Sequence, residues 1–147
     1  VTEQVADSTY KANLVQYTTP VYKKPVVVTD PEIPDTLGTS DIGVSEIWYS
    51  GGCLNMVNAI KVYEGSTGGS HVINLMADRR AENADTVKFQ VFHRCDYDPS
   101  PTELLSEYSF YSSFPVKDLM PKRDSVIIKV SWTWDGKTAS VNGKVKI

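Results

Sequence analysis

The chain has 147 residues, of which 41% are hydrophobic and 22% are charged. These values are typical of a folded globular domain and exclude a chain that is disordered throughout. No apolar run approaches the length of about 18 residues that a membrane-spanning helix needs, so membrane insertion is not expected. The net charge of −3 argues against a protein that binds the phosphate backbone, and we expect no nucleic-acid partner.

The first 35 residues differ from the rest of the chain. Prolines at positions 20, 25, 31 and 34 remove backbone donors and favour extended backbone before them. We therefore expect residues 1–35 to form an extended proline-rich arm or linker and residues 36–147 to form a single domain. Three consecutive valines at 26–28 indicate an added edge strand. Apolar side chains in the arm, such as Leu14 and Tyr17, favour an assembly element that covers this domain or a neighbouring subunit.

Downstream of the arm, short apolar segments alternate with turn signals. Strands are expected at residues 44–50, 54–64, 71–77, 86–95, 109–114, 126–134 and 138–141. Gly51–Gly52 separates the first two, and Asp135–Gly136 predicts a two-residue hairpin turn between the last two. Ser100, Pro101 and Glu103 form a helix-start signal, which predicts a short helix of about two turns over residues 100–108.

The composition supports the same fold class. Val and Ile together number 26 whereas Leu and Ala together number 14, and branched side chains favour pleated strands over helices. The gaps between strands are too short for repeated helical crossovers. The sequence therefore predicts an all-β fold, an antiparallel β-sandwich or jelly roll of about seven to nine short strands with at most one short helix.

Two cysteines, Cys53 and Cys95, lie 42 positions apart. A disulfide between them would close a loop long enough to stabilise the fold by about 3–4 kcal/mol, and it would indicate an oxidising compartment. The alternative is two buried thiols in a reducing compartment. Because the sequence has no Cys-x-x-Cys pair, we expect no metal site, and no motif indicates a cofactor.

The two histidines, His71 and His93, are the candidates for acid–base chemistry. A hydrolase centred on His71 could be built from Ser70 or another serine together with Asp78. Adjacent residues of a strand face opposite sides, however, and no Gly-x-Ser-x-Gly elbow is present. His93 shares the apolar face of its strand, where a histidine with satisfied hydrogen bonds is the commoner occupant. The sequence therefore favours a protein that is not an enzyme.

Aromatic side chains are the candidates for ligand binding. Exposed rings could stack on sugar rings or contact a protein, and we select five: Trp48, Tyr49, Tyr97, Trp132 and Trp134. Trp132 and Trp134 continue the apolar series of one strand face, which favours burial in the core over a sugar platform. In a regular strand, one of Trp48 and Tyr49 must face away from the core.

These observations favour a non-catalytic structural or recognition β-domain, working in subunit assembly or surface attachment. The chain opens on Val1 rather than Met, which we expect of a processed or excised product. The expected setting is extracellular, on a cell surface or on a virion, with protein partners and a homo-oligomer or larger assembly. The alternatives are a carbohydrate-binding module or lectin with a glycan ligand, and a hydrolase centred on His71.

Overall fold

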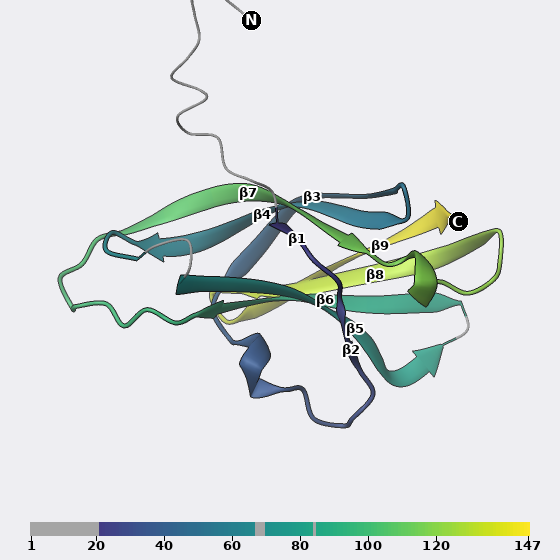
Figure 1. Cartoon of the computed structure of the whole chain (residues 1–147), viewed down its shortest axis with the longest axis horizontal. Coiled ribbons are helices and arrows are strands. Elements are labelled where there is room, and N and C mark those ends of the chain that lie inside the picture. Colours follow the sequence, from purple (N-terminus) through teal and green to yellow (C-terminus); the bar gives the residue numbers. More distant parts are fainter. Residues whose placement is uncertain (1–20, 67–69, 84) are drawn as a thin grey trace, which may run out of the picture.

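The computed structural model describes residues 21–66, 70–83 and 85–147. The described residues form nine strands in two packed sheets (Figure 1). Sheet A contains, in spatial order, β1 (Val21–Tyr22), β7 (Leu105–Pro115), β4 (Cys53–Tyr63) and β3 (Ile42–Ser50). Sheet B contains β2 (Val26–Val28), β5 (His71–Asn83), β6 (Thr86–Cys95), β8 (Ser125–Trp134) and β9 (Lys137–Lys146). The predicted all-β sandwich is confirmed.

The sheets are mixed rather than purely antiparallel. Strands β1 and β7, β2 and β5, and β6 and β8 pair in parallel, whereas the hairpin-connected strands pair antiparallel. The chain leaves β6 in sheet B, forms β7 in sheet A and returns as β8 beside β6. A crossover through the opposite sheet therefore replaces the helix that usually joins parallel strands.

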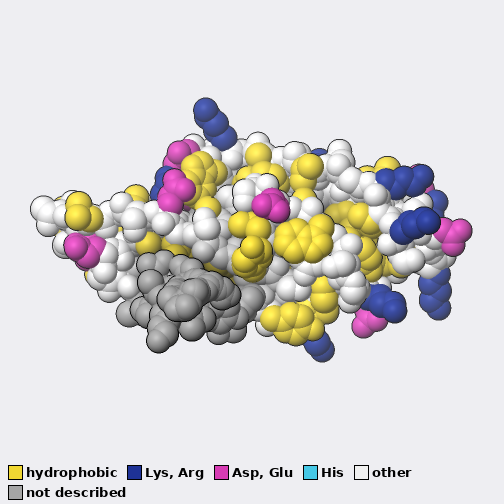
Figure 2. All heavy atoms as spheres, turned by 90° about the horizontal axis from the view of Figure 1, so that it is seen from above, with side chains coloured by type: hydrophobic (Ala, Val, Ile, Leu, Met, Phe, Trp, Pro, Cys, Tyr) yellow, Lys and Arg dark blue, Asp and Glu magenta, His cyan; other side chains and the backbone are white. Residues whose placement is uncertain are grey.

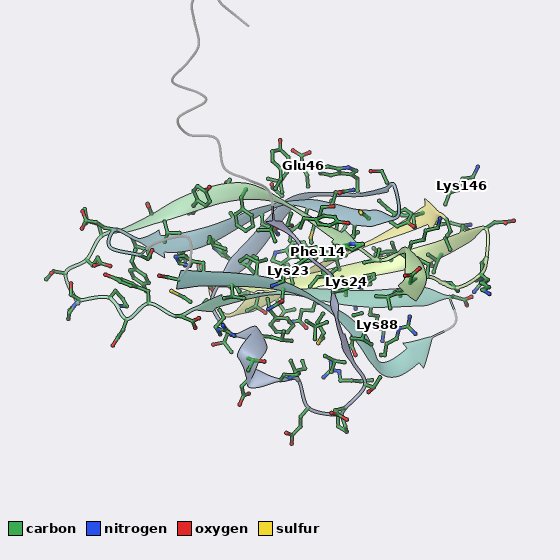
Figure 3. All side chains as sticks on the ribbon, viewed as in Figure 1. Lys23, Lys24, Glu46, Lys88, Phe114 and Lys146 are labelled. Carbon is green, nitrogen blue, oxygen red and sulfur yellow. The ribbon has the colours of Figure 1, made fainter. Side chains whose placement is uncertain are left out.

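Alternating side chains of the two sheets form one hydrophobic core. Leu54, Met56 and Ile60 of β4 point inward and are at most 4% exposed. They pack with inward residues of sheet B, among them Phe89, Val91, Val126, Ile128 and Val130. Phe114 of β7, 0% exposed, lies between the sheets (Figure 3). The period of two along each strand thus separates core from surface, as the sequence pattern predicts.

The described part of the predicted arm packs on this domain. The valines at 26–28 form an edge strand of sheet B, as predicted, and Val21–Tyr22 form an edge strand of sheet A. Val28 then packs with Leu37 and Met76 in a small second cluster on the outer side of sheet B. Residues 1–20, including Leu14 and Tyr17, lie outside the described residues. Both the division of the chain at residue 35 and the assembly role of the arm stay predictions.

The predicted helix over residues 100–108 is wrong. The backbone N–H of Glu103 donates to the carbonyl of Ser100 at 3.1 Å, so the helix-start signal makes a single turn. The chain then extends, and Leu105 and Tyr108 pair with Tyr63 and Ile60 of β4. The long-range ladder with β4 overrides the local signal. The described part of the chain contains no helix that is long and apolar enough to cross a membrane.

Two tight turns join neighbouring strands, and the one at Asp135–Gly136 confirms the predicted hairpin. Gly51 and Gly52 have φ of 61° and 76° and join β3 to β4, while Asp135 and Gly136 have φ of 50° and 75° and join β8 to β9. Positive φ at both central residues matches the twist of antiparallel strands. A β-bulge between Val44 and Glu46 shifts the register of β3 against β4. Before the bulge Val44 faces the core, and after it Ile47 and Tyr49 do.

The predicted disulfide is absent, because Cys53 and Cys95 are both free thiols. Cys53 begins β4, and Tyr63 ends this 11-residue strand about 33 Å away. The Tyr97 ring lies 6.1 Å from the Tyr63 ring, and the Cys95 thiol donates to the Tyr97 carbonyl at 3.8 Å. The cysteines therefore lie near opposite ends of β4, whereas a disulfide needs Cα atoms within about 7 Å.

We expect both cysteines to react with iodoacetamide in protein that is unfolded without any exposure to a reducing agent. Because neither thiol has a bonding partner within reach, the intact mass should increase by two carbamidomethyl groups, with or without reductant. An unreduced sample that gains no mass, and gains two groups after reduction, would contradict the separation of Cys53 and Cys95.

Candidate functional site

A cavity of about 330 Å³ opens between the sheets where β4 and β6 end. Its polar lining comes from several elements: Asp41 before β3, Lys61 and Tyr63 of β4, His93 and Cys95 of β6, and Tyr97 of the following loop. Most of these side chains interact with one another, so their contacts decide what the cavity can do.

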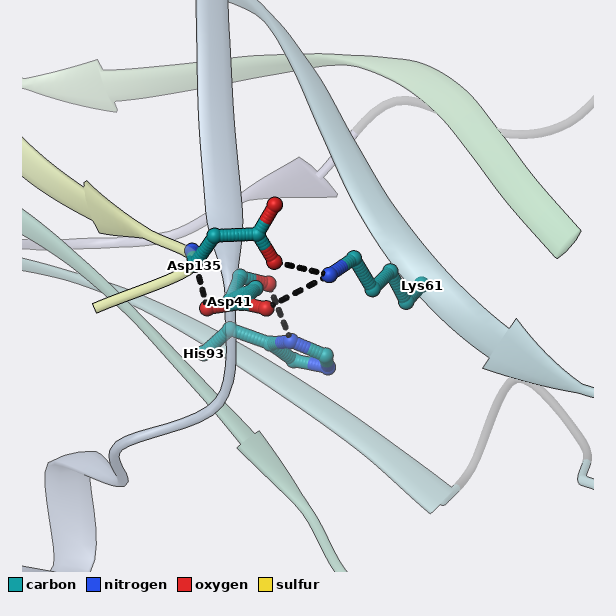
Figure 4. A network of polar contacts seen from close by, with 4 residues as sticks. All are labelled: Asp41, Lys61, His93 and Asp135. Atoms are coloured by element: carbon teal, nitrogen blue, oxygen red, sulfur yellow. Dashed lines mark hydrogen bonds and ion pairs between the residues drawn. The ribbon is translucent and has the colours of Figure 1, made fainter. Parts of the chain in front are cut away.

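A charged cluster forms one side of this region (Figure 4). Asp41 accepts a hydrogen bond from the Lys61 ammonium at 2.9 Å and another from the backbone N–H of Asp135 at 2.9 Å. Lys61 also pairs with the carboxylate of Asp135. The cluster ties the β8–β9 turn of sheet B to the start of β3 in sheet A. It therefore closes one end of the sandwich.

The ionic contacts hold the cluster in its charged form. The hydrogen bond from Lys61 lowers the pKa of Asp41, and the two carboxylates raise the pKa of Lys61. Lys61 also lies 4.8 Å from the centre of the Trp134 ring, within the range of a cation–π contact. With both of its ionic partners in place, Lys61 is a structural cation and not a free anion receptor.

A chain of hydrogen bonds begins beside this cluster. Nδ1 of His93 lies 2.9 Å from the backbone carbonyl of Asp41, and Nε2 of His93 lies 2.9 Å from Nδ1 of His71. Nε2 of His71 lies 3.0 Å from the hydroxyl of Ser66, which in turn lies 2.8 Å from the carbonyl of Tyr63. The chain thus connects segments of both sheets. His93 is 1% exposed, which agrees with the satisfied core histidine expected from the sequence.

The carbonyl of Asp41 fixes the neutral tautomers. A carbonyl only accepts, so Nδ1 of His93 carries a hydrogen and Nε2 of His93 is the acceptor. Nδ1 of His71 must then donate, which leaves the lone pair of Nε2 facing Ser66. Burial lowers the pKa of both imidazoles, and for His93 the neighbouring His71 lowers it further while the Asp41 carbonyl opposes the shift. The neutral forms are therefore favoured at pH 7.

Ser66, His71 and His93 have the contacts of a nucleophile, a base and an orienting group. Asp78, the acidic residue that the sequence suggests for a hydrolase centred on His71, is not part of this arrangement. Asp78 lies seven residues along β5 from His71, about 23 Å away, and pairs with Arg80 through two contacts of 2.8 and 2.9 Å. Asp78 as the acidic partner of His71 is therefore wrong. The second side-chain partner of His71 is another histidine.

Tyr97 closes the other side of the cavity. Its hydroxyl donates to a carboxylate oxygen of Glu103 at 2.7 Å, and this bond is the main cause that raises the Tyr97 pKa. The second carboxylate oxygen of Glu103 is buried and has no hydrogen-bond partner among the described residues. Within the described residues, no group of three His, Cys, Asp or Glu side chains is placed to hold a metal ion.

The outer side of sheet A carries the second candidate site, which we call the aromatic face. It is defined by Tyr22, Trp48 and Tyr111, which are 68%, 42% and 60% exposed, and by the half-buried Val57 between them. Cross-strand pairing aligns these residues. Trp48 pairs with Asn55, Asn55 with Ser113 and Ser113 with Tyr22, while Tyr111 pairs with Val57 in the next row. Figure 2 looks onto this side of the molecule and shows hydrophobic side chains gathered on it.

The five aromatic residues selected from the sequence do not form one surface. Trp48 lies on the aromatic face, whereas Tyr49 and Trp132 are partly buried against the core. Trp134 packs beneath Lys61, and Tyr97 lines the cavity. Asn55, the cross-strand partner of Trp48, is six residues along β4 from Lys61, about 20 Å. The structure therefore separates a polar cavity from an aromatic face.

Several of these residues were missed in the sequence. Tyr22 and Tyr111 reach the aromatic face through pairings of β7 with β1 and β4, which no local signal encodes. Ser66 belongs to a glycine-rich turn, and its contact with His71 depends on where that turn ends. The alternation within residues 86–95 did place His93 and Cys95 on one strand face. Adding the hairpin register with residues 71–77 would have brought His71 onto it.

Comparison with known proteins gives the fold alone. No protein-family model and no curated protein sequence matches the chain. Three crystal structures resemble it. A protein from Parabacteroides distasonis described as toxin-related has a TM-score of 0.63 and 21% identity over 86% of this chain and 61% of that one. A NigD-like immunity protein from Bacteroides caccae has a TM-score of 0.64 and 22% identity over 88% and 65%.

The third structure, a protein of unknown function from Bacteroides vulgatus, has a TM-score of 0.60 and 14% identity over 86% of this chain and 58% of that one. The chain thus spans less than two thirds of the length of each of the three structures it resembles. All three likenesses show that this chain has the β-rich fold of these Bacteroides and Parabacteroides proteins.

Proposed function

We propose that this chain is a non-catalytic recognition β-domain that assembles by binding a second copy of itself through the aromatic face of sheet A. The observation that carries the proposal is the alignment of Tyr22, Trp48 and Tyr111 on one sheet side, each at least 42% exposed. Aromatic side chains left in water lose the burial free energy of about 25 cal/mol per Å² of apolar surface. They are also enriched in the centres of protein interfaces.

The composition of the face suits protein contact. Glu46 lies at its edge, exposed and two residues before Trp48 on the same side of β3 (Figure 3). Asn55 and Ser113 occupy the middle, and the Ser113 hydroxyl donates to the Asn55 amide oxygen at 2.8 Å. These two side chains satisfy one another, so an approaching partner need not supply all their hydrogen bonds. Burying polar side chains that already have hydrogen-bond partners costs little, so the aromatic residues on either side of them can make the contact.

The size of the face sets the expected affinity. Three strands of 9–11 residues and the short β1 cover roughly 500 Å², from strands about 4.8 Å apart and about 30 Å long. Two stacked faces would then bury on the order of 1,000 Å² in total, near the lower limit of specific interfaces. We therefore expect a weak association that depends on concentration, not a permanent dimer.

Sedimentation equilibrium of the full chain tests this proposal, from micromolar to millimolar concentration. The mass should rise from monomer to dimer with concentration. Replacing both Trp48 and Tyr111 with serine should weaken association by at least about tenfold, as expected for central aromatic residues. Ile127→Ser is the matched control, because Ile127 is 39% exposed on the outer side of sheet B.

Two results would overturn the proposal: a monomer at every concentration, or equal association of the double serine variant and the parent chain. A carbohydrate ligand is the alternative occupant of the same aromatic residues. A glycan array that binds the parent chain but not the Trp48→Ser variant would assign the face to sugar. The compartment stays a prediction, and with both thiols free the disulfide no longer supports an extracellular setting.

Hydrolysis at Ser66 is a second candidate, favoured by the 3.0 Å contact between its hydroxyl and Nε2 of His71. In that role the imidazole would accept the hydroxyl proton as the oxygen attacks a carbonyl carbon. The hydroxyl also lies 2.8 Å from the Tyr63 carbonyl, three residues earlier, which is the ordinary contact of a serine in a turn. We expect no labelling of Ser66 by a fluorophosphonate. Labelling that is lost in His71→Gln would favour the hydrolase.

A further inference from the structure

The hydrogen-bond chain through the two histidines joins elements of both sheets. Tyr63 and Asp41 contribute the end carbonyls from β4 and the start of β3 in sheet A. His71 and His93 belong to β5 and β6 of sheet B. The two rings are 5.1 Å apart with planes inclined by 28°, a separation expected for rings that meet edge to edge through their nitrogen atoms. The hydrogen-bond chain therefore runs across one end of the sandwich and contacts both sheets.

Counting hydrogen atoms shows whether every contact of this hydrogen-bond chain can form. It has four contacts: Ser66 to the Tyr63 carbonyl, Ser66 to His71, His71 to His93, and His93 to the Asp41 carbonyl. Each contact requires one hydrogen. Two neutral imidazoles carry one N–H each and the hydroxyl carries one hydrogen, which makes three. With both histidines neutral, one contact at Ser66 therefore lacks a hydrogen.

One added proton supplies the missing hydrogen of the hydrogen-bond chain. Placed on Nε2 of His71, it donates to the Ser66 oxygen, and the Ser66 hydroxyl is then free to donate to Tyr63. The contact between His71 and His93 and the contact with Asp41 keep the same directions. A second added proton has no position from which it could donate to an acceptor of the hydrogen-bond chain. It would have to sit on Nε2 of His93, where it meets the N–H of His71 across 2.9 Å.

We propose that the His71–His93 pair is a single-proton latch, which joins the side chains of β5 and β6 with no added proton or one and opens when a second proton binds. Opening separates two buried cations and breaks the link between β5 and β6 at this end. The site is independent of the aromatic face, because it lies at the cavity about 20 Å along β4.

The described residues around the pair do not supply a counterion for the second proton. Among the groups that line the cavity with His93, Asp41 is already paired with Lys61 and Asp135, and the Lys61 ammonium is a cation. The rest of this lining contains no carboxylate; it consists of Thr39, Ser40, Tyr63, Cys95, Tyr97 and Pro99. Glu103 accepts from the Tyr97 hydroxyl through one carboxylate oxygen, and it is not among the groups whose charge acts on either imidazole. The pair must therefore bear a second charge unaided, and burial opposes that charge.

Nitrogen-resolved NMR of the full chain tests the latch directly, because these are the two histidines of the sequence. At neutral pH both imidazoles should carry their hydrogen on Nδ1. On acidification the pair should titrate in two separate steps, since coupled groups have macroscopic pKa values that belong to the pair. The contact between His71 and His93 should persist through the first step and disappear in the second.

Ser66→Ala separates the latch from a merely buried pair. The variant removes the acceptor that the first added proton uses, so the first step should move to lower pH while the second stays in place. Ser113→Ala is the matched control, since its hydroxyl bonds Asn55 on the aromatic face. It should leave both steps unchanged.

Stability gives an independent readout with a defined sign. Below the ordinary histidine pKa of 6.5, the unfolded chain binds a proton at each imidazole, whereas the folded pair resists the second. Stability is therefore present above pH 6.5 and is lost as the pH falls, by up to about tenfold in the folding equilibrium per pH unit for each proton. His71→Gln should reduce this slope.

Hydrogen on Nε2 of either neutral ring, or two independent titrations near pH 6.5, would overturn the latch. So would a doubly protonated pair that keeps the contact between His71 and His93, or an unchanged slope in His71→Gln.

Discussion

Replacing Phe114 with alanine should lower the free energy of unfolding by about 3–5 kcal/mol. The Phe114 ring is 0% exposed and belongs to the main core cluster. Deleting the ring removes the favourable free energy of burying it. It also leaves a cavity that the neighbouring strands are too rigid to fill. Urea denaturation followed by circular dichroism measures the difference, because a single β-domain of this size is expected to unfold in one step.

Leu105→Ala in the same strand is the control for Phe114→Ala. Leu105 is 49% exposed near the start of β7, so its loss should change stability by about 0.5 kcal/mol or less. Equal effects at the two positions would mean that the inward and outward sides of β7 are assigned incorrectly. The assignment of Tyr111 to the aromatic face would then fail as well.

Replacing His93 with phenylalanine should destabilise the chain by about 1–3 kcal/mol at pH 7.5. Phenylalanine keeps a planar ring in the 1%-exposed position but removes both nitrogen atoms. The Asp41 carbonyl and Nδ1 of His71 each lose the partner that now lies 2.9 Å away. A polar group that loses its partner away from water carries its desolvation penalty uncompensated.

The measurement for His93→Phe is again the unfolding midpoint, with Ser66→Ala as the comparison. Ser66 lies at the less buried end of the hydrogen-bond chain, so its loss should be the smaller one. A His93→Phe variant as stable as the parent chain would show that the buried hydrogen bonds add nothing to a plain apolar core. The link between the sheets would then lose its structural basis.

Local patterns predicted most of the fold. Alternation over residues 86–95 and 126–134 placed β6 and β8 almost to the residue, and Asp135–Gly136 placed the hairpin between β8 and β9. These signals are local, because side-chain period and positive φ are decided within a few residues. The parallel pairing of β6 with β8 could not be predicted this way. It depends on the chain crossing to sheet A and back between them.

Long-range pairing also explains the failures at the sites. A helix-start signal at residues 100–103 was overridden by the ladder of β7 with β4. The choice between Trp48 and Tyr49 was left open, because the bulge after Val44 that turns Trp48 outward has no local signature. Predicting the histidine pair requires the register of β5 against β6. Predicting that the cysteines lie too far apart to bond requires their positions relative to the two ends of β4. Each of these depends on which strands pair with one another, and the side-chain pattern within a single strand does not specify its partner.

The most direct test of the proposed function is a dilution series of the full chain followed by residue-resolved amide NMR. If two copies pair through the aromatic face, dilution should shift the amide signals of Trp48, Val57 and Tyr111 and leave those of His71 and His93 in place. Shifts confined to β9 or to the cavity, or no shifts between millimolar and micromolar concentration, would contradict self-recognition through sheet A.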